Sequence, residues 1–238
     1  MNTPIFQNIL FLDIETVAQF SSFEHLPKRT QLLWEKKCNF FKDSSSKTTS
    51  ELYDRAGIYA EFGKIVAIAI GYFIERGDLL ELRVKGLANA NEKELLSEFI
   101  EVLTHFDMRK LKLCAHNGKE FDFPYLSRRM VVNNIELPAI LDHAGKKPWE
   151  VPHIDTMELW KFGDYKHYTS LDLLASLFDV HTSKDDIDGS MVNEVYHNQN
   201  NLERINKYCQ EDIRVLAQVY LKLAQVSEKK LHKTVYIN

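Results

Sequence analysis

The stretch Ile9-Leu-Phe-Leu-Asp-Ile-Glu-Thr16 places two carboxylates, Asp13 and Glu15, at the end of an apolar run. Residues 7–14 are apolar on both alternating faces, which predicts a buried central strand. On a strand, residues two positions apart point to the same face, so the two carboxylates lie together. An unpaired buried carboxylate is costly, and a divalent cation is a partner that converging carboxylates can share. For this motif alone, a strand that runs out into solvent is the alternative.

Two more acidic residues stand beside apolar segments. Asp122, in His116-Asn-Gly-Lys-Glu-Phe-Asp-Phe-Pro, precedes a predicted helix, where an ordinary N-cap is the alternative role. Asp212, in Tyr208-Cys-Gln-Glu-Asp, lies on the last predicted helix. At about 100° per residue, Asp212 projects at the edge of the apolar stripe, and Tyr208 lies one turn before it on the same side. A solvated helix face accounts poorly for Asp212, which favours a functional role.

The overall composition is that of a globular protein without specialised tails. The 238 residues are 45% hydrophobic and 27% charged, with a net charge of −4, so any contact with nucleic acid must be local. The three cysteines are far apart in the sequence, which indicates a reducing compartment. No secretory signal or membrane-spanning apolar segment is recognised. We expect a single domain over residues 1–238 that is cytoplasmic and does not associate with membranes.

The hydrophobic periodicity predicts alternating strands and helices. The second and third strands are expected to form a hairpin, and the predicted strands span 7–14, 64–74, 79–84, 111–115 and 151–154. The predicted helices span 91–106, 122–132, 155–161, 170–178, 189–197 and 201–227. Segments 20–62 and 142–153 are interpreted as insertions, the first with a helical piece over 30–41 and a mobile polar loop over 43–50. This order predicts an α/β fold, with a mixed sheet covered by helices on both faces.

Other common catalytic patterns are missing from the sequence. It contains no His-Glu-x-x-His, paired Cys/His zinc spacing, Gly-x-Ser-x-Gly or Gly-x-Gly-x-x-Gly motif. Gly118-Lys119 lacks the earlier glycine and the following Ser or Thr of a phosphate-binding loop. The acidic residues are therefore the strongest candidates for catalysis.

Together, the acidic motifs resemble those of the DEDD superfamily of 3′–5′ exonucleases, which have a ribonuclease H-like fold. The matching residues are Asp13 and Glu15 for the first motif, Asn117 through Asp122 for the second, and Tyr208 with Asp212 for the Tyr form of the third. More narrowly, phrases such as Ala60-Glu-Phe-Gly-Lys-Ile-Val66 are similar to the stand-alone family related to the exonuclease domain of family-B DNA polymerases. Because the chain ends shortly after the third motif, no polymerase domain is expected.

The resemblance implies hydrolysis of the terminal phosphodiester with two divalent cations, Mg²⁺ or Mn²⁺, releasing nucleoside monophosphates from a 3′ end. It implies a catalytic set in which Asp13 bridges both cations, Glu15 and Asp212 bind the cation that activates water, and Asp122 supports the other. Tyr208, with an ordinary pKa near 10, would orient the attacking water. Candidate contacts to the terminal nucleotide are Asn117 and Thr16.

The expected partner is single-stranded nucleic acid with a free 3′ end, preferably DNA. Trp149 is a candidate for stacking on a base. Backbone phosphates need cations, and the candidates are Lys36, Lys37, Arg128, Arg129, Lys146, Lys147, Lys161 and Lys166. A 3′–5′ exoribonuclease is one alternative, because recognition of the 2′-OH cannot be read from these residues. A module that binds nucleic-acid ends without cutting is another, although such a module would be expected to lack at least one acidic residue, and none is missing.

Overall fold

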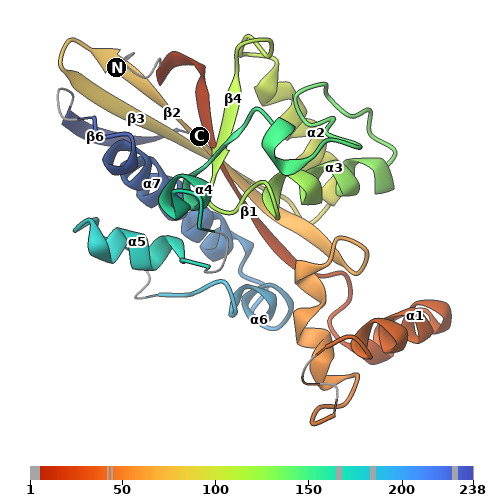
Figure 1. Cartoon of the computed structure of the whole chain (residues 1–238). Coiled ribbons are helices and arrows are strands. Elements are labelled where there is room, and N and C mark those ends of the chain that lie inside the picture. Colours follow the sequence, from red (N-terminus) through yellow and green to blue (C-terminus); the bar gives the residue numbers. More distant parts are fainter. Residues whose placement is uncertain are drawn as a thin grey trace.

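The computed structural model describes residues 6–41, 43, 45–164, 168–182, 186–226 and 230–237. A six-stranded mixed sheet forms its centre, with strand order β5-β4-β1-β2-β3-β6 (Figure 1). β1 pairs antiparallel with β2 and parallel with β4. The strands are β1 (Ile9–Ala18), β2 (Gly63–Arg76), β3 (Leu79–Ala88), β4 (Lys112–Ala115), β5 (Ile154–Asp155) and β6 (Lys230–Ile237).

Helices cover both faces of the sheet, as predicted (Figure 1). On one face, α6 (Val192–His197) and α7 (Leu202–Leu223) share an apolar cluster with Phe11 of β1. On the other, α2 (Glu92–Leu103) and α3 (Asp122–Val132) share a second cluster with Leu12. The remaining helical elements are α1 (Lys28–Cys38), α4 (Thr156–Lys161), α5 (Leu171–Leu177) and four short 3₁₀ helices, η1 (Phe6–Asn8), η2 (Phe23–His25), η3 (Glu51–Ile58) and η4 (Pro148–Glu150). Within the described residues, none of the helices has both the length and the apolarity needed to cross a bilayer.

Two predictions about strands are wrong. The segment near 151–154 is not the last strand, because β6 follows α7 and pairs parallel with β3. β1 also continues to Ala18, well beyond residue 14, because β2 stays paired with it as far as Gly63. Asp13 and Glu15 therefore lie inside a strand that continues beyond them. On the β4 side, however, pairing with β1 stops at Phe11.

The predicted insertion 20–62 forms an arm that projects from the sheet. α1 and η3 enclose a small apolar cluster of their own around the fully buried Trp34, whose Nε1 donates to the Thr49 carbonyl oxygen at 2.9 Å. Figure 1 shows α1 at the outer end of this arm. The predicted helical piece 30–41 corresponds to α1. The described residues of segment 43–50 lie mostly in turns, and its mobility stays a prediction.

The arm begins where β1 is fastened to α6. Ala18, the last residue of β1, donates its N–H to Asn193 Oδ1 at 2.9 Å. Its carbonyl oxygen accepts a hydrogen bond from His197 Nε2, also at 2.9 Å. Both backbone groups of the last strand residue are thus held by side chains of α6.

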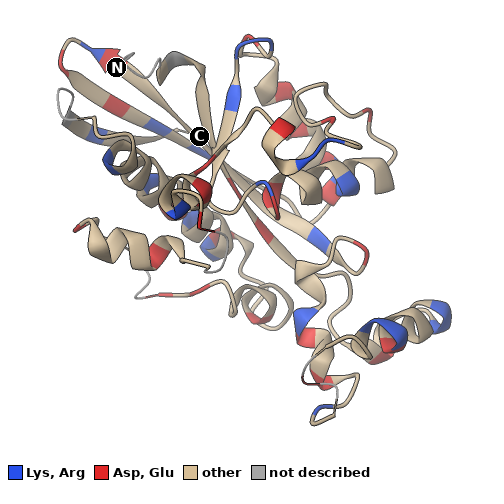
Figure 2. Cartoon of the chain, viewed as in Figure 1, with Lys and Arg blue, Asp and Glu red and all other residues tan. Residues whose placement is uncertain are grey.

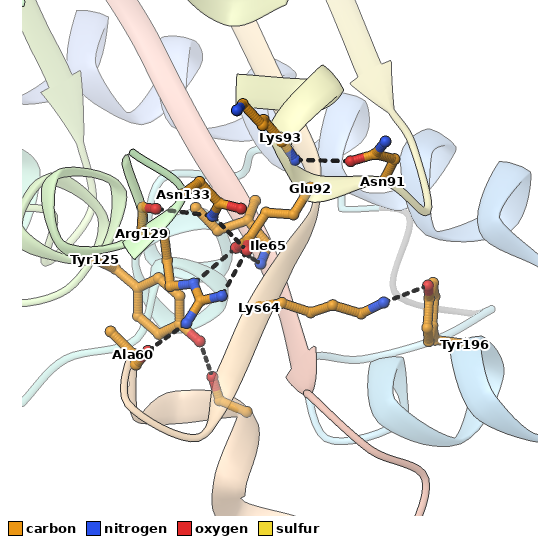
Figure 3. Close-up of polar contacts among 11 residues, drawn as sticks. Ala60, Lys64, Ile65, Asn91, Glu92, Lys93, Tyr125, Arg129, Asn133 and Tyr196 are labelled. Carbon is orange, nitrogen blue, oxygen red and sulfur yellow. Dashed lines mark hydrogen bonds and ion pairs between the residues drawn. The ribbon is translucent and has the colours of Figure 1, made fainter. Parts of the chain in front are cut away.

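A buried ion pair joins α2, α3 and the start of β2 (Figure 3). Arg129 Nη2 and Nε lie 2.6 and 2.9 Å from the two carboxylate oxygens of Glu92, and Arg129 Nη1 donates to the Ala60 carbonyl oxygen at 2.8 Å. Glu92 also accepts the N–H of Ile65 at 2.7 Å. Arg129 is only 4% exposed. The prediction that Arg129 contacts phosphate is therefore wrong, because its guanidinium group is engaged inside the protein.

Replacing Arg129 by alanine should strongly destabilise the fold. The change leaves the Glu92 carboxylate buried without its cation, a defect that typically costs about 3–5 kcal/mol. We expect the free energy of unfolding, measured by urea denaturation, to fall by about that amount. Arg109→Ala is the control, because it removes an ion pair with Asp107 whose arginine side chain is 89% exposed, and it should change stability little. Similar losses in the two variants would contradict the structural role of Arg129.

Candidate functional site

β1 presents the two carboxylates of the first motif to the face that α7 covers. Asp13 lies opposite Ala69 and Glu15 lies opposite Ala67 on β2, so only small side chains stand beside the carboxylates. The pairing register shifts directly after Glu15, and such irregularities often re-aim side chains next to active sites. Glu15 is 8% exposed, so its charge lies almost entirely inside the protein.

α7 brings the third motif against this pair. Cys209 Sγ donates to Asp13 Oδ2 at 3.3 Å, and the potential ligand atoms of Asp13, Glu15 and Cys209 lie within 4.8 Å of one another. The hydroxyl of Tyr208 hydrogen-bonds to Asp212, one turn later on the helix. Burial, and then the surrounding carboxylates, raise the pKa of Tyr208 above its ordinary value. Tyr208 is therefore protonated at neutral pH.

Asp122 reaches the same part of β1 from α3. The backbone N–H of Ile14, which lies between the two acidic residues of β1, donates to the Asp122 carboxylate. This contact is made beyond Phe11, where β4 no longer pairs with β1. Burial raises the pKa of Asp122 to about 7, and the nearby Asp155 adds to this rise while the backbone hydrogen bonds oppose it. The negative charge of Asp122 is thus buried, and the hydrogen bonds it accepts offset only part of the cost of burying it.

Asp155 fixes the loop that leads to Asp122, and the sequence did not reveal this role. Its Oδ1 accepts the N–H groups of Asn117 at 3.0 Å and Met157 at 2.9 Å, and its Oδ2 accepts that of Lys119 at 3.1 Å. One carboxylate therefore caps α4 and shapes the turn before α3. The available signal was an Asp directly before a predicted helix, which indicates a cap but no distant partner.

The two predicted nucleotide contacts differ in their surroundings. Asn117 has a left-handed backbone with φ of 62°, which asparagine tolerates better than most residues. Its Oδ1 is buried and, among the described residues, has no hydrogen-bond partner. Thr16 instead hydrogen-bonds to the hydroxyl of Tyr125, which donates to the Gly57 carbonyl oxygen at 2.7 Å. The Oδ1 of Asn117 is therefore unused in this structure, and the nucleotide-contact roles of Asn117 and Thr16 both stay predictions.

The candidate phosphate contacts are spread over several elements. Arg128 and Lys146 line a cavity beside α3, and Lys147 lies next to it with its Nζ 5.2 Å from the centre of the Trp149 ring. Trp149 is 76% exposed and therefore available to a partner. The others are Lys36 and Lys37 on α1, Lys161 at the end of α4, and Lys166, which lies outside the described residues.

Segments that are distant in the sequence therefore converge on the middle of β1. Asp13, Glu15 and Asp212 surround Tyr208, and Asp122 contacts the backbone between the first two. Figure 2 shows acidic segments within β1 where it crosses the sheet. A mixed sheet with helices on both faces and a carboxylate cluster on its central strand defines a ribonuclease H-like α/β protein.

Comparison with known proteins identifies the family. Residues 58–238 match a family described as predicted 3′–5′ exonucleases related to the exonuclease domain of PolB, and the chain belongs to this family. The solved structure of the family B DNA polymerase from the hyperthermophilic archaeon Pyrobaculum calidifontis is similar, with a TM-score of 0.56 and 16% identity over 92% of this chain. The similarity covers 25% of that polymerase chain, so this chain spans about a quarter of its length. No curated protein matches.

These comparisons confirm the predicted fold and family resemblance. Exonuclease domains of this kind act on nucleic acid with divalent metal ions, and the acidic cluster of β1 is a candidate for binding them. The matched residues begin at 58, so Asp13 and Glu15 lie outside them. The assignment of these two residues therefore depends on their geometry.

The raised pKa of Asp122 gives a pH-dependent prediction for metal-free protein. Folding disfavours the ionised carboxyl group, because the pKa rises from an ordinary 3.8 to about 7. The resulting penalty is absent below pH 3.8 and grows as the pH rises toward 7. In chelator at pH 8, we expect Asp122→Asn to be more stable than the wild type, by on the order of a few kcal/mol.

This difference should shrink when unfolding is measured at pH 6 and again at pH 4.5. Asp78→Asn, in an exposed turn after β2, controls for the loss of one negative charge. An Asp122→Asn protein that is less stable than the wild type at pH 8 would show that the carboxylate is well compensated.

Proposed function

We propose that this protein is a 3′–5′ exonuclease that releases nucleoside monophosphates from the 3′ end of single-stranded DNA, using two divalent cations, Mg²⁺ or Mn²⁺. The proposal rests chiefly on one observation: Asp13 and Glu15 lie together on β1, Asp122 of α3 contacts the backbone between them, and Asp212 of α7 shares Tyr208 with them. Membership in a family of predicted exonucleases supports the same reaction.

The chemistry of the site fits divalent cations. Asp13, Glu15, Asp122 and Asp212 would bind them through carboxylate oxygens, the donors that Mg²⁺ and Mn²⁺ prefer. The raised pKa of buried Asp122 agrees with this assignment, because a nearby cation would offset its charge. Such cations supply activation of water and neutralisation of charge on the phosphate.

The remaining residues would position the reactants. Tyr208 is protonated and donates to Asp212, so its oxygen can still accept a hydrogen bond from the attacking water. The unpartnered Oδ1 of Asn117 can accept a hydrogen bond from the 3′ hydroxyl of the terminal nucleotide. The thiol of Cys209 holds the Asp13 carboxylate from the side of α7.

The first test is degradation of single-stranded DNA labelled at its 5′ end. We expect progressive shortening from the 3′ end in Mg²⁺ or Mn²⁺ and intact DNA in chelator. Asp13→Ala should abolish shortening, because it removes a central cation ligand, while circular dichroism shows a retained fold. Wild-type turnover in the folded variant would refute the role of Asp13.

Parallel reactions with RNA of the same sequence test the substrate. Faster shortening of RNA would contradict the assignment to DNA. Tight binding of both nucleic acids without cleavage would instead identify a module that binds ends.

Tyr208→Phe tests the positioning of water. The ring remains to pack, but the hydroxyl that holds the water is lost, and this interaction matters chiefly in the transition state. We expect kcat to fall by about 10- to 100-fold with a much smaller change in KM. Steady-state kinetics on a short labelled DNA measure both values, and a change in KM alone would place Tyr208 in substrate binding.

A further inference from the structure

A cavity of about 580 Å³ lies between α3 and the loop that precedes β5. This volume falls within the range of typical small-ligand sites, about 300–1,000 Å³. Its walls are largely apolar and include Pro124, Val131, Val132, Leu137, Leu141 and Val151. Val131 is 63% exposed, so part of this apolar surface faces solvent.

The charged residues that line the cavity are mostly basic. They are Lys119, Arg128 and Lys146, against one acidic residue, Glu61. Lys119 pairs with Glu158 at 2.7 Å, whereas Arg128 and Lys146 are exposed and, in the described part of the chain, have no ion pair. The two cations with no ion pair come from opposite sides, one from α3 and one from the loop. Such an arrangement suits the phosphates of a nucleic-acid backbone.

His143 adds unused hydrogen-bonding capacity to this wall. Both of its ring nitrogens are buried and, among the described residues, make no hydrogen bond of ordinary geometry, although the nearby Asp142 backbone opposes the lowering of its pKa. Burial, and then the neighbouring Lys146, lower the pKa of His143, so the ring is neutral at pH 7 and offers one donor and one acceptor. The exposed ring of Trp149 follows Pro148, which also lines the cavity.

The cavity and the acidic cluster share the first turn of α3. Asp122 contacts the backbone of Ile14, while the next residues, Phe123 and Pro124, line the cavity. Lys119, in the loop fixed by Asp155, lines it as well. The first turn of α3 therefore separates the two, so a strand whose 3′ end lies at the carboxylates would reach the cavity by passing around this turn.

We infer that the cavity holds a nucleotide of the substrate strand upstream of the 3′ end, with its base on the apolar walls and its phosphates near Arg128 and Lys146. This inference rests on the proposed function, because it extends the same strand to a second contact. If the cavity binds an upstream nucleotide, only strands long enough to reach it gain affinity from this contact, so binding should depend on strand length.

Binding of 5′-fluorescein-labelled oligothymidylates of 3, 6 and 12 nucleotides, measured by anisotropy in chelator, tests the inference. The wild type should bind the 12-mer about tenfold more tightly than the 3-mer. The double variant Arg128→Glu/Lys146→Glu should bind the 12-mer and the 3-mer with similar affinity. For the 12-mer, the slope of log affinity against log salt concentration should become about two units less steep than in the wild type. The matched control is Lys93→Glu/Lys112→Glu, which makes the same charge change at exposed lysines on α2 and β4. It should retain the dependence on length.

A second variant, Val131→Gln, tests the apolar wall at an exposed position without changing the charge, and should weaken 12-mer binding more than 3-mer binding.

Equal losses in the cavity and control variants, or wild-type binding in the cavity variants, would overturn the inference. Displacement of the 12-mer by dTMP at a comparable concentration would also overturn it, since the cavity would then hold free mononucleotides. The two proposals can fail separately. Binding is measured in chelator, where no cleavage occurs, so length-dependent binding could be observed even if the protein were not an exonuclease. Conversely, normal cleavage could be observed even if the cavity did not bind the strand.

Discussion

The rest of the structure depends on placing two like charges inside the central strand of a sheet. Asp13, which is half-buried, and Glu15, which is buried, repel each other and lose hydration, so their neighbours must offset both effects. Small residues on β2 leave space beside them, and the Cys209 thiol of α7 donates to one carboxylate. α7 therefore combines an apolar stripe, which packs on the sheet, with a polar interruption where it crosses the charges.

Two further buried charges hold the element that supplies Asp122. Asp155 accepts backbone N–H groups of the loop before α3, and Arg129 fixes the body of that helix to Glu92. One contact holds the loop before α3 and the other holds the body of α3. The direction in which the Asp122 side chain points toward β1 is therefore set by Asp155 and Glu92, which lie outside α3. Support of this kind keeps catalytic groups in place without the entropy loss of ordering them during the reaction.

The sequence was sufficient where the signal is local. Alternation placed Asp13 and Glu15 on one face, the helical period placed Tyr208 beside Asp212, and the predicted bounds of α3 agree with the structure. It was insufficient where a partner is distant. Cys209 contacts a residue 196 positions away, and Arg129 contacts Glu92 across 37 positions. β6 was missed because its pairing with β3 also joins distant segments, although its Thr-Val-Tyr-Ile run is typical of a strand.

The two hydrogen bonds that hold the backbone of Ala18 have a structural consequence. Both backbone groups of this residue are held by α6, so the β1 end of the arm cannot shift without moving α6 or breaking these hydrogen bonds. The apolar cluster of the arm also includes Ala18 itself, so the arm packs against the end of β1 as well as within itself. A different arm joined after Ala18 would therefore need to supply new packing for Ala18 and new acceptors for Tyr125 and Arg129, which donate to the carbonyl oxygens of Gly57 and Ala60 in the present arm.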